Sequence, residues 1–227
     1  VINAQGLVVC SGTFLNGLIH IGTDCFPAGR LGEKASCLLS LNIVNKGFSV
    51  SRLKTGTPPR LLASSINWDG LTCAMGDELP VPFSIQTRRP FRPKNIPCYI
   101  VDTNKGVHDV LRDNLDKSSM YSGKIESVGP RYCPSIEDKI VRFADREKHQ
   151  LFLEPEWNNA KQIYLNGFST SMPRNIQERA LKKISGLEEV ELIRPGYAIE
   201  YDYFPTSQLK STLETKSIDG LYFAGQM

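Results

Sequence analysis

Two short apolar runs, each ending at a glycine, constrain the fold of this 227-residue chain most strongly. Residues 6–13 are predicted to form a buried strand that enters a glycine turn, and residues 220–226 repeat the pattern. Strands that end in a glycine turn are typical of places where a sheet meets a nucleotide. No G-x-G-x-x-G fingerprint precedes the first run. We therefore expect a piece of a dinucleotide-binding α/β protein without its phosphate-binding unit.

Between these runs the sequence predicts mixed helices and strands without internal repeats. Helices are expected over residues 38–46, 106–115 and 175–184, with Gly47 and Gly186 ending the first and the last. Strands are expected over residues 48–53, 98–101, 150–153 and 190–193. Residues 57–59 (Thr-Pro-Pro) interrupt regular structure, and residues 61–97 are expected to be a loop-rich insert.

The composition is that of an ordinary globular protein, with 41% hydrophobic and 22% charged residues. No apolar stretch approaches the roughly 20 residues that a membrane span needs. The net charge of +3 neither demands nor excludes an RNA partner. One segment is locally basic, because Arg88, Arg89, Arg92 and Lys94 surround Phe91. This cluster is a candidate RNA contact with a ring for base stacking, and a solvated loop is the alternative.

The cysteines and histidines show no metal-binding pattern. The six cysteines contain no C-x-x-C pair, and the three histidines have no ligand spacing with them. We therefore assign no metal. A chain of this length without a secretory signal is expected to keep its thiols reduced in a cytosol-like compartment.

One run carries the clearest chemical signal. Ser135 is a natural helix N-cap, and Asp138 can return its hydrogen bond in a variant of the capping box. Ile136, Ile140 and Phe143 then repeat as an apolar stripe. Cys133 precedes the positive end of this helix and stands two residues after Arg131, so both features favour the thiolate. The sequence therefore predicts a nucleophilic cysteine, and a buried structural cysteine is the alternative.

This run, together with residues 52–60, 153–156 and 194–202, resembles the MnmG (GidA) family. The resemblance extends over residues 8–226. Members of this family are the FAD-dependent large subunit of an enzyme that modifies the wobble uridine of certain tRNAs. The resemblance implies an α/β fold with a partial FAD-binding domain, of the glutathione-reductase-like Rossmann type, interrupted by a mixed α+β inserted domain. Residues 1–60 and 208–227 would belong to the FAD-binding domain, and residues 61–207 to the insert.

The resemblance also implies site residues. Ser36 and Gln226 would contact FAD, and Cys133 would be the thiol that adds to C6 of uracil so that C5 becomes nucleophilic. The NAD-binding segment would consist of Gly129, Pro130, Arg131, Tyr132, Cys133, Pro134, Ser135, Ile136, Glu137, Asp138, Lys139, Ile140, Val141, Arg142 and Phe143. The helix amides would hold a pyrophosphate there, although a tRNA phosphate is an equal alternative. Lys54 and Arg60 are a second candidate pair for phosphate contact.

The reaction implied by the family uses NADH, FAD and methylenetetrahydrofolate. It adds a carboxymethylaminomethyl or aminomethyl group to C5 of the wobble uridine, in a homodimer that works with an MnmE-type GTPase. The expected compartment is the bacterial cytoplasm, with the mitochondrion as the alternative. We expect the 227-residue chain by itself to bind FAD weakly or not at all, because the first βαβ unit is missing.

Two other functions fit parts of the sequence. One is a folate- and FAD-dependent tRNA uridine C5 methyltransferase, against which the 129–143 motif argues. The other is a catalytically silent fragment that binds tRNA or a protein partner. The sequence departs from the family pattern at Asp102, where histidine is usual, and at Trp157, where glycine is usual. Local geometry at these two positions is therefore expected to differ.

Overall fold

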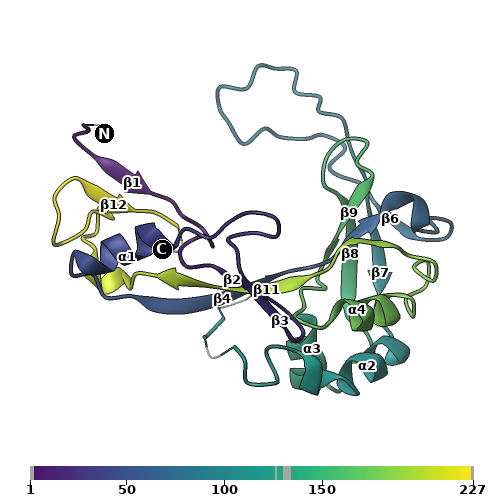
Figure 1. The fold of residues 1–227 in the computed structure, drawn as a ribbon. Coiled ribbons are helices and arrows are strands. Elements are labelled where there is room, and N and C mark those ends of the chain that lie inside the picture. Colours follow the sequence, from purple (N-terminus) through teal and green to yellow (C-terminus); the bar gives the residue numbers. More distant parts are fainter. Residues whose placement is uncertain (1–2, 126, 130–133, 226–227) are drawn as a thin grey trace.

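The computed structural model describes residues 3–125, 127–129 and 134–225. Figure 1 shows two lobes joined by a four-stranded sheet, with α1, β1 and β12 in one lobe and α2, α3 and α4 in the other. The sheets of the described residues are one parallel pair and two antiparallel sheets. The expected mixed α/β fold is therefore confirmed.

The first lobe contains the two terminal strands that the sequence predicted. The first of them is not buried as expected, because its two-stranded sheet leaves Leu7 60% and Val8 58% exposed. β1 (Leu7–Val9) and β12 (Leu221–Phe223) pair in parallel, with Leu7 opposite Leu221. The predicted first helix is also confirmed as α1 (Cys37–Asn45), and Gly47, which follows its C-cap residue Lys46, has a φ of +92°. A small core beneath these elements contains Leu15, Ile43, Phe48, Phe204 and Phe223.

The joining sheet has the order β3-β2-β11-β4. Its strands are β2 (Leu18–Ile21), β3 (Asp24–Pro27), β4 (Ser51–Thr57) and β11 (Tyr197–Tyr203). β4 begins three residues later than the start expected for this strand, because Phe48 packs into the core of the first lobe instead. β11 pairs along its whole length with β4, from Tyr197 opposite Thr57 to Tyr203 opposite Ser51. A strand from the predicted insert thus pairs with strands from residues 1–60, and the domain boundaries stay predictions.

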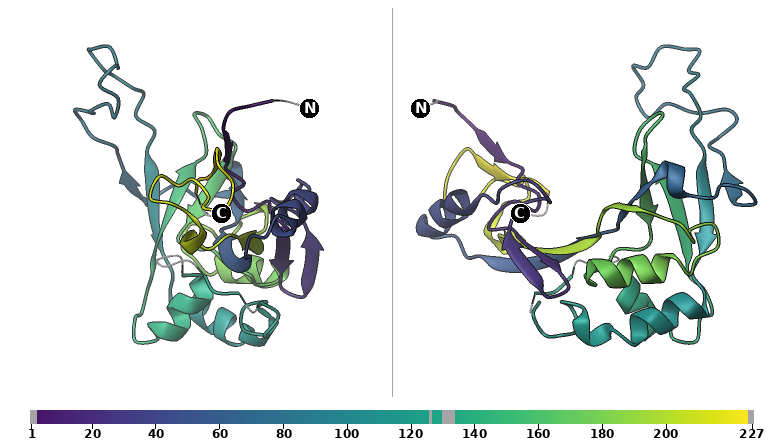
Figure 2. Two further views of the ribbon diagram at one scale, coloured as in Figure 1. Left: turned by 90° about the vertical axis from the view of Figure 1, so that its left-hand side faces the viewer. Right: turned by 45° about the vertical axis from the view of Figure 1, so that its right-hand side comes forward.

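The second lobe is built on a six-stranded antiparallel sheet with the order β10-β5-β9-β8-β7-β6. Its strands are β5 (Arg60–Leu62), β6 (Thr72–Ala74), β7 (Cys98–Asp102), β8 (Gln150–Pro155), β9 (Gln162–Asn166) and β10 (Leu192–Arg194). The helices α2 (Lys105–Arg112), α3 (Ile136–Arg142) and α4 (Arg174–Leu181) lie together at one side of this sheet (Figure 2). Between them is the largest apolar core of the described residues, which includes Leu111, Ile136, Leu151 and Ile176.

The loop-rich insert is confirmed, although it contains two short strands. After β5, a 3-10 turn (Ala63–Ser65) and β6, residues 75–97 have no regular secondary structure. Figures 1 and 2 show this segment, here called the arm, extending away from both lobes. Six large apolar side chains of the arm are exposed, namely Met75, Leu79, Val81, Phe83, Ile85 and Ile96.

Candidate nucleotide-binding site

The start of α3 has the capping geometry that the sequence predicted. Ser135 Oγ accepts the amide N–H of Asp138 at 3.1 Å, and Asp138 Oδ2 accepts the amide N–H of Ser135 at 3.1 Å. The amide of Ile136 donates to the carbonyl oxygen of Ser169 at 2.7 Å. Because Ile136 and Asp138 already donate within the chain, these two amides do not supply the anion site expected at the helix start.

The apolar stripe of α3 is shorter than predicted. Ile136 and Ile140 are buried in the core, whereas the side chain of Phe143 is 44% exposed. The expectation for Phe143 is wrong because the helix ends at Arg142, and the backbone leaves helical geometry at Phe143. Its ring instead lies 5.2 Å from the guanidinium carbon of Arg146.

Glu137 anchors α3 to two neighbouring segments. Its side chain is fully buried, and its Oε1 accepts hydrogen bonds from Ser118 Oγ at 3.1 Å, Thr170 Oγ1 at 3.0 Å and the amide of Ser171 at 2.9 Å. These three hydrogen bonds join the buried carboxylate to the loop at Ser118 and to the segment at residues 170–171. Glu137 therefore fixes the orientation of the helix that carries the candidate site.

A cavity of about 500 Å³ lies beside α3. Three cationic side chains line it, Lys139, Arg146 and Lys148. Lys148 forms an ion pair with Asp102 at 2.8 Å, so Asp102 takes part in this site. The remaining lining residues are Pro134, Phe143, His149 and Gln150. The lining carries more positive than negative charge and includes an aromatic ring, a combination that suits a nucleotide.

Lys139 and Arg142 occupy different environments on α3. Lys139 Nζ donates to the carbonyl oxygen of Gly167 at 2.8 Å, and burial lowers the pKa of this ammonium group. The side chain of Arg142 is exposed and lies 3.6 Å from Asp138 Oδ1. Lys139 therefore lines the cavity with a partly buried ammonium group, whereas Arg142 belongs to the solvated face of the helix.

Two histidines stack against the inner wall of the cavity. The rings of His108 and His149 lie 5.3 Å apart, and Thr103 Oγ1 lies 2.8 Å from His108 Nε2. Burial lowers the pKa of both histidines, and nearby positive charge from Arg112 and Lys139 lowers them further. His149 Nε2 is buried and forms no hydrogen bond among the described residues. His149 therefore belongs to the lining of the cavity, although its Nε2 atom is itself buried.

Several predicted site residues lie outside the described residues. These are Pro130, Arg131, Tyr132 and Cys133 of the 129–143 motif, and Gln226. The described residues on either side of the motif gap are informative. Gly129 packs against Lys54, and Pro134 lines the cavity.

The predicted FAD contact Ser36 lies at the N-terminus of α1. It occupies the N-cap position, but its hydroxyl forms no cap hydrogen bond. The backbone of Ser36 is fixed, because its amide donates to Phe14 O at 2.7 Å. Ser36 is only partly buried. Its hydroxyl therefore has no capping role, and the predicted FAD contact of Ser36 stays a prediction.

Of the two candidate phosphate-binding residues on β4 and β5, Lys54 is buried and Arg60 is engaged within the second lobe. Arg60 donates to Glu156 at 3.0 Å, to Thr57 Oγ1 at 2.6 Å and to Pro58 O at 2.7 Å. It also lies over the ring of Tyr164. Arg60 therefore connects the strands of the second lobe.

The basic cluster of the arm is exposed, as its composition indicated. Arg88, Arg89 and Arg92 are exposed, and Lys94 donates to Asn158 Oδ1 at 2.8 Å. Phe91 is half-buried. The arm thus exposes three arginine side chains, together with the acidic Asp77 and Glu78.

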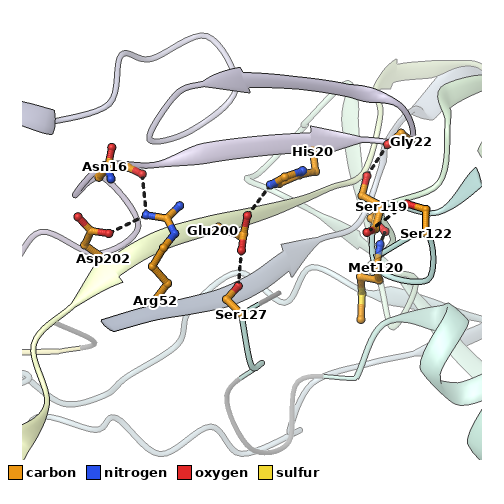
Figure 3. Close-up of polar contacts among 11 residues, drawn as sticks. Asn16, His20, Gly22, Arg52, Ser119, Met120, Ser122, Ser127, Glu200 and Asp202 are labelled. Atoms are coloured by element: carbon orange, nitrogen blue, oxygen red, sulfur yellow. Dashed lines mark hydrogen bonds and ion pairs between the residues drawn. The ribbon is translucent and has the colours of Figure 1, made fainter. Parts of the chain in front are cut away.

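A second polar site lies on the joining sheet and was not predicted from the sequence. His20 Nε2 lies 2.8 Å from Glu200 Oε2, and Ser127 Oγ donates to Glu200 Oε1 at 2.6 Å (Figure 3). Arg52 Nη1 forms an ion pair with Asp202 at 2.6 Å on the same sheet. The two partners of each of these contacts are 73 to 180 positions apart in the chain, so no local spacing could have revealed them. In the cation-lined cavity, the run Arg146, Lys148 and His149 was a local signal that the sequence reasoning did not use.

Among the described residues, no group of three or more histidine, cysteine, aspartate or glutamate side chains is arranged to hold a metal ion. Within the same residues, no helix combines the length and the apolar character needed to span a membrane.

The parallel strand pair, the two antiparallel sheets and the four helices of the described residues define a mixed α/β protein. The sequence matches the family described as glucose inhibited division protein A over residues 1–227. The chain belongs to this family.

Proteins named MnmG and GidA are similar to this chain in sequence and structure. The tRNA uridine 5-carboxymethylaminomethyl modification enzyme MnmG of Flavobacterium johnsoniae is 52% identical over 226 residues, which cover all of this chain and 36% of the relative. The same enzyme of Christiangramia forsetii is 51% identical over 224 residues, 99% of this chain and 36% of the relative. The form I crystal structure of Aquifex aeolicus GidA superposes with a TM-score of 0.89 at 48% identity, covering 97% of this chain and 38% of that one. The chain thus spans little more than a third of the length of these relatives.

Proposed function

We propose that this chain contributes to an FAD-dependent enzyme that adds a carboxymethylaminomethyl or aminomethyl group to C5 of the wobble uridine of tRNA. Support comes from the similarity to MnmG proteins over the whole chain. The observation that carries the proposal is the cation-lined cavity. Pro134, the residue that follows Cys133 in the sequence, lines this cavity.

In this proposal the cavity binds NADH. Lys139, Arg146 and Lys148 would attract the pyrophosphate, and the exposed ring of Phe143 would pack against a base or ribose. Ser36, whose hydroxyl has no capping role, would contact FAD together with Gln226. When bound, NADH and FAD would supply the reducing electrons, and methylenetetrahydrofolate the one-carbon unit.

Cys133 would act as the nucleophile toward the base. Its thiolate adds to C6 of uracil, and the C5=C6 electron pair moves toward the C4 carbonyl, so that C5 can bond to the one-carbon unit. Loss of the C5 proton then allows the C–S bond to break and restores the ring. α3 is held rigidly by Glu137 and by the capping box at Ser135, which would orient the residues just before it.

The expected partners follow from the same assignment. They are tRNA, an MnmE-type GTPase and a second copy of the protein, and the expected compartment is the bacterial cytoplasm, with the mitochondrion as the alternative. The exposed arginines of the arm would contact the tRNA backbone.

The test is NADH binding by a double variant of the cavity, measured by fluorescence titration in the longest open reading frame that contains this sequence. Arg146→Gln with Lys148→Gln should weaken NADH binding by about tenfold or more, because two charge-assisted contacts are lost. The matched control is Lys182→Gln with Lys183→Gln at the exposed end of α4, which should bind NADH like the wild type. Equal NADH affinity in the cavity variant and the wild type would refute this use of the cavity.

A mass-spectrometric analysis of tRNA nucleosides separates the enzyme from its alternatives. A strain that lacks the gene should lose the carboxymethylaminomethyl or aminomethyl nucleoside and regain it on complementation. Loss of a 5-methyluridine instead would identify a methyltransferase, and no change would identify a binding protein without this activity.

A further inference from the structure

An aromatic pair lies where the arm joins the second lobe. The ring centroids of Trp68 and Tyr99 are 4.8 Å apart, and the two rings are tilted by 57°. Trp68 Nε1 donates to the carbonyl oxygen of Ala63 at 3.0 Å, which fixes the orientation of the indole ring. Both side chains pack against the large apolar core, yet both are only partly buried. Part of each ring therefore stays accessible outside the core.

A cavity of about 380 Å³ has this aromatic pair in its wall. Pro97, Pro155 and Ile163 extend the apolar part of the lining. The polar part consists of Lys94 and three asparagines, Asn95, Asn158 and Asn159. A mostly apolar cavity of this size with a few polar groups is typical of a site for a small planar group.

This cavity lies at the end of the second lobe from which the arm extends (Figure 1). Tyr99 stands near the start of β7, directly after the arm, and Pro155 is the last residue of β8. The cation-lined cavity beside α3 is instead lined by Asp102 and Gln150, at the opposite ends of the same two strands. The two cavities are therefore separate, about 10 Å apart along the strands.

The polar groups of the lining offer mainly hydrogen-bond donors. Lys94 Nζ donates to Asn158 Oδ1 at 2.8 Å, and the amide of Gly76 donates to Asn95 Oδ1 at 3.0 Å. Each of these two asparagines has its oxygen engaged and keeps two side-chain N–H donors. The ammonium group of Lys94 adds further donors. A ligand that suits this lining therefore presents hydrogen-bond acceptors.

The charge of the adjoining arm favours a polyanion. In residues 75–97, four cationic side chains exceed two carboxylates; the cations are Arg88, Arg89, Arg92 and Lys94, and the carboxylates are Asp77 and Glu78. The described lining of the cavity itself contains no acidic residue. A planar ring with hydrogen-bond acceptors, attached to a polyanionic backbone, is an unpaired base of an RNA. Aromatic side chains beside cations are the usual means by which proteins bind such bases.

We propose that this cavity binds one unpaired base of an RNA. The base stacks on Trp68 and Tyr99, its edge accepts hydrogen bonds from Asn95 and Asn158, and the arginines of the arm contact the backbone beside it. The inference rests on the proposed function for the identity of the RNA, a tRNA. It adds a base contact apart from the uridine that is modified, because that uridine would react at Cys133, beside the other cavity.

The test uses three variants of the longest open reading frame that contains this sequence. Tyr99→Leu removes the stacking ring and keeps an apolar side chain, whereas Tyr99→Phe keeps the ring. Asn158→Asp keeps an acceptor for Lys94 and removes both N–H donors, on an exposed side chain. Asn42→Asp makes the same charge change at an exposed position of α1 in the other lobe and is the control.

Binding of a labelled oligouridylate of about ten nucleotides is measured by fluorescence anisotropy over a range of salt concentrations, together with each melting temperature. Tyr99→Leu should weaken binding by about fivefold or more, because one stacked base is lost. Its salt dependence should equal that of the wild type, since stacking releases no counterions. Tyr99→Phe and Asn42→Asp should bind like the wild type. Asn158→Asp should bind more weakly by a similar factor, because a carboxylate repels the acceptors of the base.

The proposal is overturned if either Tyr99→Leu or Asn158→Asp binds the oligonucleotide as the wild type does. Asn158→Asp decides the matter if Tyr99→Leu melts lower, because its side chain is exposed. The proposal is also overturned if a synthetic peptide of residues 77–87 binds the wild type but not Tyr99→Leu while RNA binds both equally. The cavity would then hold a proline-rich protein segment.

Failure of this inference is distinct from failure of the proposed function. Oligouridylate binding requires neither NADH nor modification of a nucleoside, so it can be lost while the nucleoside analysis still identifies the enzyme. Conversely, an unchanged nucleoside profile would refute the proposed reaction and leave the effect of Tyr99→Leu on RNA binding intact.

Discussion

His20 Nε2 lies 2.8 Å from Glu200 Oε2, and this contact joins strands β2 and β11 inside the sheet that connects the two lobes. His20 is 3% exposed, and Glu200 is almost as deeply buried. Ser127 binds the other carboxylate oxygen of Glu200, so one side chain ties a loop to both strands. The geometry between the lobes therefore depends on a buried polar group.

Glu200→Ala should destabilise the protein by about 2–4 kcal/mol, because His20 and Ser127 would lose their buried acceptor. Glu200→Gln keeps one acceptor oxygen and should cost less. Urea denaturation followed by circular dichroism measures both free energies of unfolding. A loss below about 0.5 kcal/mol for Glu200→Ala, typical of surface positions, would show that the contact does not support the joining sheet.

Glu137→Ala should also destabilise the chain strongly. It leaves the Ser118 hydroxyl, the Thr170 hydroxyl and the Ser171 amide without their shared acceptor, at a cost of about 2–5 kcal/mol. Glu137→Gln should recover much of this loss, since its carbonyl oxygen can accept the same hydrogen bonds. The measurement is the denaturation midpoint of the two variants. Equal midpoints for Ala and Gln would mean that side-chain volume, and not the acceptor, holds α3 in place.

The stacked histidines predict acid sensitivity. The pKa values of His108 and His149 are lowered below 6.5 in the folded state, with burial as the main cause. The unfolded chain therefore binds more protons as pH falls below about 6.5, and stability that is present above this pH is lost as pH falls through the folded pKa values.

His149→Phe removes one titrating ring, together with its interactions with His108, Lys139 and Arg146. The melting temperature of the wild type should fall more steeply between pH 7.5 and pH 5 than that of the variant. Differential scanning calorimetry over this range gives both slopes. Parallel slopes would show that other groups control the acid sensitivity.

The arm predicts a salt-dependent contact with tRNA. Arg88→Gln with Arg89→Gln should weaken tRNA binding and flatten its dependence on salt, because fewer counterions are released per complex. The melting temperature should not change, since both side chains are exposed. The control carries the same charge change at Lys182 and Lys183. If both double variants keep the wild-type salt slope, the arm is a solvated loop and does not contact the RNA.

Cys133→Ser tests the proposed nucleophile in the longest open reading frame that contains this sequence. C5 modification should be abolished while tRNA binding persists, because a serine hydroxyl adds poorly to C6 and phosphate contacts carry the affinity. A buried structural cysteine would behave differently, since the hydroxyl would cost about 1–3 kcal/mol if unpaired. Melting temperature and wobble-uridine modification are measured together. Normal modification by a normally folded variant would exclude Cys133 as the nucleophile, and a loss of activity in proportion to stability would favour the structural role.

Local sequence determined much of the secondary structure. The capping box at Ser135 and Asp138, the C-cap glycine at Gly47 and the strands β7 and β8 were predicted because each depends on neighbouring residues. Capping and side-chain periodicity act within a few residues, so a sequence pattern records them directly. The sequence likewise indicated the unstructured arm, because prolines disfavour regular hydrogen bonding.

Only the tertiary structure placed the polar groups that surround the candidate sites. His20, Ser127 and Glu200 meet because β2 and the loop before Gly129 pack on β11, and pairing of distant strands leaves no short-range pattern. The position of Phe143 was likewise not predictable from its spacing. Because α3 ends at Arg142, the ring of Phe143 lines the cavity and does not pack in the core. Lys54 was a phosphate candidate beside Arg60 in the sequence. The fold distinguished them, because it gave Arg60 several acceptors on neighbouring segments and packed the buried Lys54 beside Gly129.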